Sequence, residues 1–157
     1  TAAQLQPYFN SLQHWFTTNR LKLAPAKSTA TLLTNWTAEH SHIPNLTINN
    51  TPLTHTHTPK ILGVTYDTSM TFKQHITNIK NKVTPRLNAL KSLAHTTFGH
   101  NKETNTTVYK QFIRSVMDYA SPAWASNLAE THLNTLQTLQ NKALKIITSL
   151  AHLFGNC

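Results

Sequence analysis

The stretch that most constrains the fold covers residues 60–67, Lys-Ile-Leu-Gly-Val-Thr-Tyr-Asp. Its apolar residues form a dense run of strand length, and Gly63 within that run permits a bulge or the close approach of another backbone. Asp67 and Ser69 then supply turn and helix-cap chemistry. We therefore predict a buried strand that ends at the start of a helix. This strand separates two architectures, because short strands precede it and helical periodicity follows it.

The region before this stretch begins with a helical pattern. Leu5, Phe9, Leu12 and Phe16 recur at helical spacing, so residues 2–18 are predicted to form an amphipathic helix that stops at Asn19. Residues 20–23 alternate and indicate a short strand, which a proline turn separates from a second strand at 29–34. The pair Asn49-Asn50 tolerates positive φ and predicts a two-residue hairpin turn.

The region after residue 67 is predicted to form three helices. Apolar spacing indicates helices near 71–94, 108–120 and 129–150, and we expect Pro85 to kink or divide the first. The predicted fold class is α+β, with a leading helix, a small antiparallel sheet and a three-helix bundle. We place the boundary between the two parts so that one covers residues 1–67 and the other residues 68–157.

The charge of the chain narrows the class of partner. The chain has 157 residues, with 14 Lys and Arg against 5 Asp and Glu, which gives a formal charge of +9. Such a balance favours a polyanion, either nucleic acid or anionic lipid. No apolar run approaches the ~20 residues that span a bilayer, so we expect no membrane insertion. Cys157 is the one cysteine, which fits a reducing, intracellular compartment, and the chain starts at Thr1 without Met, so we expect a fragment.

The residue patterns of common catalytic sites are missing from the sequence. His40 with His42, and His55 with His57, have His-x-His spacing in loops, but Glu39 is the one acid near them, so we interpret them as incidental. No Gly-x-Ser-x-Gly elbow, phosphate loop or paired carboxylates occur. Five scattered acids cannot supply a two-metal site. We expect this chain to bind no metal or cofactor by itself.

Cations flank the apolar stripe of the first predicted bundle helix. Lys73, Lys80 and Lys91 fall on one flank, and Lys82 with Arg86 on the other. Such a helix could lay its flanks along phosphates while its stripe packs on the bundle; the alternative is a solvated face with snorkelling lysines.

Other cations and the tryptophans leave similar alternatives open. The other two helices also carry cations that could contact phosphates or simply face solvent: Lys110 with Arg114, and Lys142 with Lys145. Arg114 and Asp118 at i, i+4 are expected to form a local ion pair. Trp15, Trp36 and Trp124 are expected in the core rather than stacked on bases.

Several motifs occur in a fixed order along the chain. They are Leu12-x-x-Trp15-x-x-x-Asn19-x-Leu21-x-Leu23-x-x-x-Lys27-Ser28, Ile48-Asn49-Asn50-x-x-Leu53, Ile61-Leu62-Gly63-Val64-x-x-Asp67-x-x-Met70-x-Phe72-x-x-His75-Ile76, Tyr109-Lys110-x-x-x-Arg114-Ser115-Val116-x-x-Tyr119-Ala120-x-Pro122-x-Trp124 and Leu139-Gln140-Asn141-Lys142-Ala143-Leu144-Lys145. As an ordered set they resemble the distal palm and the following thumb helices of reverse transcriptases from LINE-type (non-LTR) retrotransposons.

This resemblance implies roles for particular residues. Lys27 would lie near the incoming nucleotide and stabilise the pyrophosphate leaving group. Leu62, Gly63 and Val64 would match the primer-grip hairpin, whose glycine lets the backbone approach the primer terminus. The helices after residue 67 would form the thumb, and their cations would hold a duplex of RNA template and DNA primer.

The resemblance also implies parts that this chain lacks. The aspartates that bind Mg²⁺ in this family are absent and would lie upstream of Thr1, together with the rest of the palm and the fingers, so the chain should be inactive alone. The parent element would act in the cytoplasm and nucleus. Two alternatives stay open, a non-catalytic basic nucleic-acid-binding module and an inactive structural remnant of a decayed element.

Overall fold

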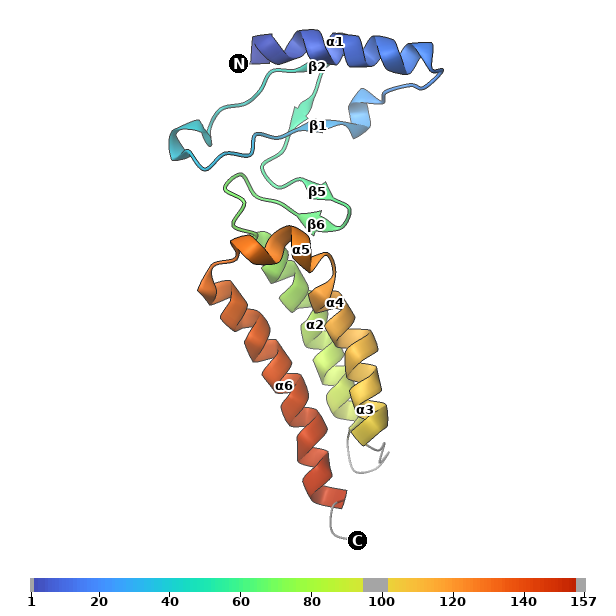
Figure 1. The fold of residues 1–157 in the computed structure, drawn as a ribbon, viewed down its shortest axis with the longest axis vertical. Helices are drawn as coiled ribbons and strands as arrows, with labels where there is room; N and C mark the ends of the chain where they lie inside the picture. Colours follow the sequence, from blue (N-terminus) through green and yellow to red (C-terminus); the bar gives the residue numbers. More distant parts are fainter. Residues whose placement is uncertain (1, 95–101, 155–157) are drawn as a thin grey trace. The chain divides into compact units, whose positions relative to one another are not determined.

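The computed structural model describes residues 2–94 and 102–154 and divides the chain into two compact units, Thr1–Thr71 and Phe72–Cys157 (Figure 1). The sequence-based division fell at residues 67 and 68. The assignment of these units to a palm portion and a thumb stays a prediction.

The first unit begins with the predicted helix, α1 (Ala2–Thr18), which continues through Pro7. Two glutamine side chains of α1 form hydrogen bonds with the strand β2 (Thr47–Ile48) and with the turn after it. Gln6 exchanges two hydrogen bonds with the backbone of Thr47, at 3.0 and 3.1 Å, and the amide of Asn49 donates to Oε1 of Gln13 at 3.2 Å. The helix therefore has a defined register against the hairpin that begins with β2.

The strands form three short ladders in place of the single antiparallel sheet that we predicted. One ladder is parallel and two are antiparallel: β1 (Thr29–Ala30) with β4 (Thr54–His55) in parallel, then β2 with β3 (Thr51–Pro52), and β5 (Lys60–Ile61) with β6 (Val64–Thr65).

Some strand predictions are wrong and one turn prediction is confirmed. The strand predicted at 20–23 does not form, because Arg20 has a left-handed backbone (φ 58°) and the chain then enters a 3₁₀ turn, η1 (Pro25–Lys27). The strand predicted at 29–34 is reduced to the two residues of β1. The hairpin turn at Asn49-Asn50 is confirmed, since both residues have positive φ, 51° and 58°.

Residues 60–67 form a tight hairpin and not the single buried strand that we predicted. Leu62 and Gly63 occupy the turn with φ of 47° and 86°, and the side chain of Leu62 is 87% exposed while Val64 is buried. Turn formation at Gly63 therefore overrides the apolar run around it. Asp67 accepts hydrogen bonds from the amide and hydroxyl of Thr71, so it caps the turn that follows β6 rather than the helix.

The second unit is built from three long helical segments that pack together (Figure 1). The first is α2 (Lys73–Leu93), which Pro85 does not divide, contrary to one of the two outcomes that we expected. The second runs through α3 (Lys102–Val108), a π-helical stretch η3 (Tyr109–Arg114) and α4 (Ser115–Asp118). Two short turns, α5 (Ser121–Trp124) and η4 (Ala125–Asn127), lead to the third, α6 (Glu130–Phe154).

The core of this unit consists of the apolar stripes predicted from helical spacing. Its most buried side chains include Phe72, Ile76, Val83, Leu90, Ile113 and Ala143. Trp124 is buried as predicted, with its indole N–H donating to the carbonyl of Tyr119 at 2.9 Å, and Arg114 pairs with Asp118 at 2.9 Å. The same expectation is wrong for the two tryptophans of the first unit, because Trp15 and Trp36 are 55% and 72% exposed. No helix within residues 2–94 and 102–154 is long and apolar enough to cross a membrane.

Candidate nucleic-acid interface

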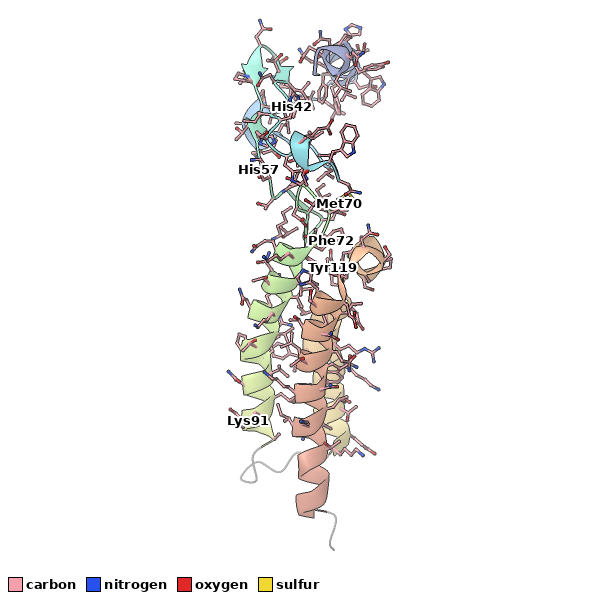
Figure 2. All side chains as sticks on the ribbon, turned by 90° about the vertical axis from the view of Figure 1, so that its left-hand side faces the viewer. His42, His57, Met70, Phe72, Lys91 and Tyr119 are labelled. Atoms are coloured by element: carbon pink, nitrogen blue, oxygen red, sulfur yellow. The ribbon has the colours of Figure 1, made fainter. Side chains whose placement is uncertain are left out.

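One face of α2 presents a row of cations. The helix buries its apolar stripe and exposes Lys73, Lys80 and Lys91, which share one flank at helical periodicity. At a rise of about 1.5 Å per residue the row extends over about 27 Å. The α2 sequence contains no acidic residue, so no i, i+4 partner on the helix neutralises these charges. Figure 2 shows Lys91 near the C-terminal end of α2 and Phe72 just before its start.

The row continues into a groove between α2 and α6. This groove has a volume of about 320 Å³, and its apolar floor includes Leu87, Leu139 and Ile146. Lys91 lines it from α2, and Lys142 and Lys145 line it from α6. None of the described residues that line the groove is acidic. Helical spacing left the role of the two α6 lysines open; the packing of α6 beside α2 brings them to the same groove as Lys91.

The cations on the other flank of α2 differ from this row. Arg86 packs on the π-helical stretch η3: its guanidinium lies 4.5 Å from the ring centre of Phe112 and donates to the carbonyl of Phe112 at 2.5 Å. Lys82 is exposed, and its charge together with burial lowers the pKa of His75. His75 is buried and contacts the ring of Trp124 edge to face at 5.5 Å. The structure therefore groups Lys91 with the two α6 lysines, and places Arg86 in a contact with Phe112.

The remaining predicted site residues lie in the first unit. Leu62 and Gly63 form the exposed tip of the β5–β6 hairpin, and Val64 is its buried anchor. Lys27 is the last residue of η1 and is exposed. The backbone amide of Lys27 donates to the carbonyl of Ala24 at 3.0 Å, and β1 begins two residues later.

The histidines do not assemble into a metal centre in the described part of the chain. Within that part, no group of three or more His, Cys, Asp or Glu side chains could hold an ion. The rings of His55 and His57 contact each other edge to face at 4.5 Å. Nε2 of His40 lies 3.3 Å from both the carbonyl of Thr34 and the hydroxyl of Ser69, so His40 joins two loops of the first unit.

Comparison with known proteins finds relatives of the chain. It is 30% identical over 144 residues to the RNA-directed DNA polymerase from mobile element jockey of Drosophila funebris, and 25% identical over 144 residues to that of Drosophila melanogaster. These matches cover 92% of this chain. It is also 26% identical over 105 residues to the probable RNA-directed DNA polymerase from transposon X-element of Drosophila melanogaster, covering 67% of this chain. No protein-family profile and no solved structure matches the chain significantly.

These relatives are RNA-directed DNA polymerases of non-LTR retrotransposons. The chain is similar to the jockey polymerases over 92% of its length and to the X-element polymerase over 67%. The predicted family resemblance is thereby confirmed. The chain spans about 15% of the length of the jockey polymerases.

Proposed function

We propose that this chain is the distal palm and thumb segment of a non-LTR reverse transcriptase and holds a duplex of RNA template and DNA primer. The observation that carries this proposal is the match to jockey polymerases over 92% of the chain. Two structural features support it, the exposed β5–β6 hairpin tip and the lysine-lined face of α2 and α6.

The hairpin tip has the form that a primer grip requires. Gly63 carries no side chain, so a sugar-phosphate backbone can approach the main chain closely at this point. Leu62 beside it is 87% exposed and offers an apolar contact to the terminal sugar or base. Val64 is buried and anchors the base of the hairpin. The hairpin therefore combines an accessible tip with a fixed base.

The second unit supplies the backbone contacts of a thumb. Lys73, Lys80 and Lys91 with Lys142 and Lys145 form a surface that we call the lysine face. Contacts from such lysines go to phosphates and are independent of sequence, which is what a polymerase that translocates needs. Lys82 and Arg86 lie on the other flank of α2 and are not part of the lysine face, and Arg86 contacts Phe112.

One residue of this chain is assigned to the chemistry of nucleotide addition. Among the described residues, no group of three or more His, Cys, Asp or Glu side chains could hold Mg²⁺. Lys27 is the one residue of this chain that we assign to the reaction. In a complete polymerase its ammonium group would stabilise the charge that develops on the pyrophosphate leaving group.

A binding measurement tests the proposal against both alternatives. An RNA–DNA hybrid with a recessed DNA 3′ end and a blunt hybrid of equal length are titrated with the chain in 50 mM salt. A primer grip predicts tighter binding to the recessed end, and Leu62→Ser removes this preference without changing the affinity for the blunt hybrid. Equal affinity for both hybrids in the unsubstituted chain indicates a basic binding module, and binding to neither indicates a structural remnant.

A further inference from the structure

A pocket in the first unit lies at the C-terminal end of α1. Its lining includes no residue of the β5–β6 hairpin tip and none of the lysine face. Its volume is about 440 Å³, within the range of small-molecule sites, which runs from about 300 to 1,000 Å³. Gln13, Phe16, Arg20, Leu21, Lys22 and Asn49 line it. The pocket thus combines two cations, two amides and an apolar wall that includes one aromatic ring.

The backbone around Arg20 is unusual for an arginine. Arg20 ends α1 in a left-handed conformation (φ 58°), with its amide donating to Thr17 and the amide of Leu21 donating to Phe16 at 2.8 Å. Glycine is the common residue at this position because it adopts positive φ without steric cost. Arg20 takes this conformation despite the cost, and it lines the pocket. A contact between the Arg20 side chain and a ligand in the pocket would account for an arginine at this position.

The pocket carries positive charge that nearby acids do not neutralise. Arg20 and Lys22 both line it, and none of its lining residues is acidic. The two acids of the first unit are used elsewhere, since Glu39 accepts a hydrogen bond from Thr34 and Asp67 accepts two from Thr71. The carbonyls at the end of α1 are also occupied, because Asn19 donates to Trp15 from its backbone and from its side chain. The C-terminal end of the helix still carries a partial negative charge, which Arg20 and Lys22 offset.

The apolar wall gives the pocket a second recognition element. The Phe16 ring is half-buried, is fixed edge to face against Trp15 at 5.3 Å, and lines the pocket beside Leu21. Gln13 contributes a polar group to the same pocket. Its Oε1 accepts a hydrogen bond from the amide of Asn49 at 3.2 Å, and its side-chain NH₂ group is a hydrogen-bond donor. A ligand that suits both elements has an anionic group and a flat, partly apolar group.

We propose that this pocket binds one nucleotide, with Arg20 and Lys22 on its phosphate and Phe16 against its base. Arginine pairs with phosphate through two parallel N–H donors, and an aromatic ring offers a stacking surface to any base. The nucleotide comes either free or as one unit of a single strand. Both sources present the same chemistry to the pocket.

The test titrates adenosine 5′-monophosphate, adenosine and an eight-residue deoxyadenosine strand into the ¹⁵N-labelled chain and follows backbone amide shifts. The proposal predicts saturable shifts at residues 13–23 and 49 with the monophosphate, and at least tenfold weaker binding of adenosine. Arg20→Gly is the main variant, because glycine suits the left-handed backbone. It should raise or preserve the melting temperature and still weaken binding at least tenfold.

The control is Lys102→Gln, which removes an exposed cation outside the pocket and outside the β5–β6 hairpin. It should leave binding of the monophosphate unchanged. Tighter binding of the strand than of the monophosphate identifies a nucleic-acid strand as the source, and the reverse identifies a free nucleotide. Equal binding of adenosine and its monophosphate, or unchanged binding by Arg20→Gly, overturns the proposal.

Discussion

Removing three charges from the lysine face should flatten the salt dependence of duplex binding. The variant is Lys73→Gln, Lys80→Gln and Lys91→Gln together. All three side chains are exposed and none takes part in an ion pair within the described residues, so each substitution should change the free energy of unfolding by no more than about 0.5 kcal/mol. Any large change in binding then reports on the interface and not on folding.

The size of the effect follows from the number of lysines on this face. Each phosphate neutralised contributes about −0.9 to the slope of log K against log salt on B-form DNA, so the five lysines predict a slope of about −4.5. Between 50 and 200 mM salt the affinity should then fall about 500-fold. The triple variant should show a slope of about −1.8 and a loss of about 12-fold over the same range.

The assay is fluorescence anisotropy with a labelled 20-base-pair DNA duplex at several salt concentrations. The matched control replaces Lys27, Lys102 and Lys110 by Gln, which removes the same charge from exposed positions outside the lysine face and outside the β5–β6 hairpin. The control should keep most of the slope. An unchanged slope in the first variant, or an equal flattening in the control, refutes the assignment of this face to duplex binding.

Three further predictions address other parts of the chain. Gly63→Val should lower the free energy of unfolding by roughly 1–3 kcal/mol in urea, because φ of 86° is strained for a branched residue; an unchanged midpoint argues against the turn. Burial and Lys82 lower the pKa of His75 below its usual 6.5, so the unfolded chain binds the extra proton and stability should fall as the pH drops below about 6.5. His75→Gln should weaken that dependence, and an identical pH profile contradicts it. Lys27→Ala in a complete polymerase should slow nucleotide incorporation far more than it weakens duplex binding; equal losses indicate a positional role only.

Periodicity in the sequence predicted the long helices well. The apolar spacing of α1, α2 and α6 is regular over at least four turns, so tertiary packing only reinforces what the pattern indicates. The Asn49-Asn50 turn was also predictable, because its conformation depends on two adjacent residues. Local chemistry determines these elements almost completely.

Pairing between distant segments was not predictable in the same way. β1 and β4 are parallel partners 25 positions apart, and no residue pattern encodes that choice. The run around Gly63 was misassigned because apolar composition was given more weight than turn formation. The π-helical stretch η3 also has no periodic signature in the sequence.

The candidate site shows the same division between local and long-range information. The helical wheel of α2 placed Lys73, Lys80 and Lys91 on one flank, as the structure does. It could not indicate that α6 packs beside that flank and adds Lys142 and Lys145. It also gave no indication that Arg86 contacts Phe112, because a contact between helices is not encoded in a single helix.

The measurement that tests the central claim most directly is site-specific crosslinking of a primer–template to this chain. An RNA–DNA hybrid carries a photoreactive group either at the primer 3′ end or on a backbone phosphate about eight base pairs upstream, and the crosslinked peptides are mapped by mass spectrometry. The account predicts crosslinks from the 3′ end to residues 60–65 and from the upstream phosphate to α2 or α6. Crosslinks from the 3′ end that avoid the hairpin, or upstream crosslinks confined to α3 and η3, would contradict the claim that the chain holds primer and template.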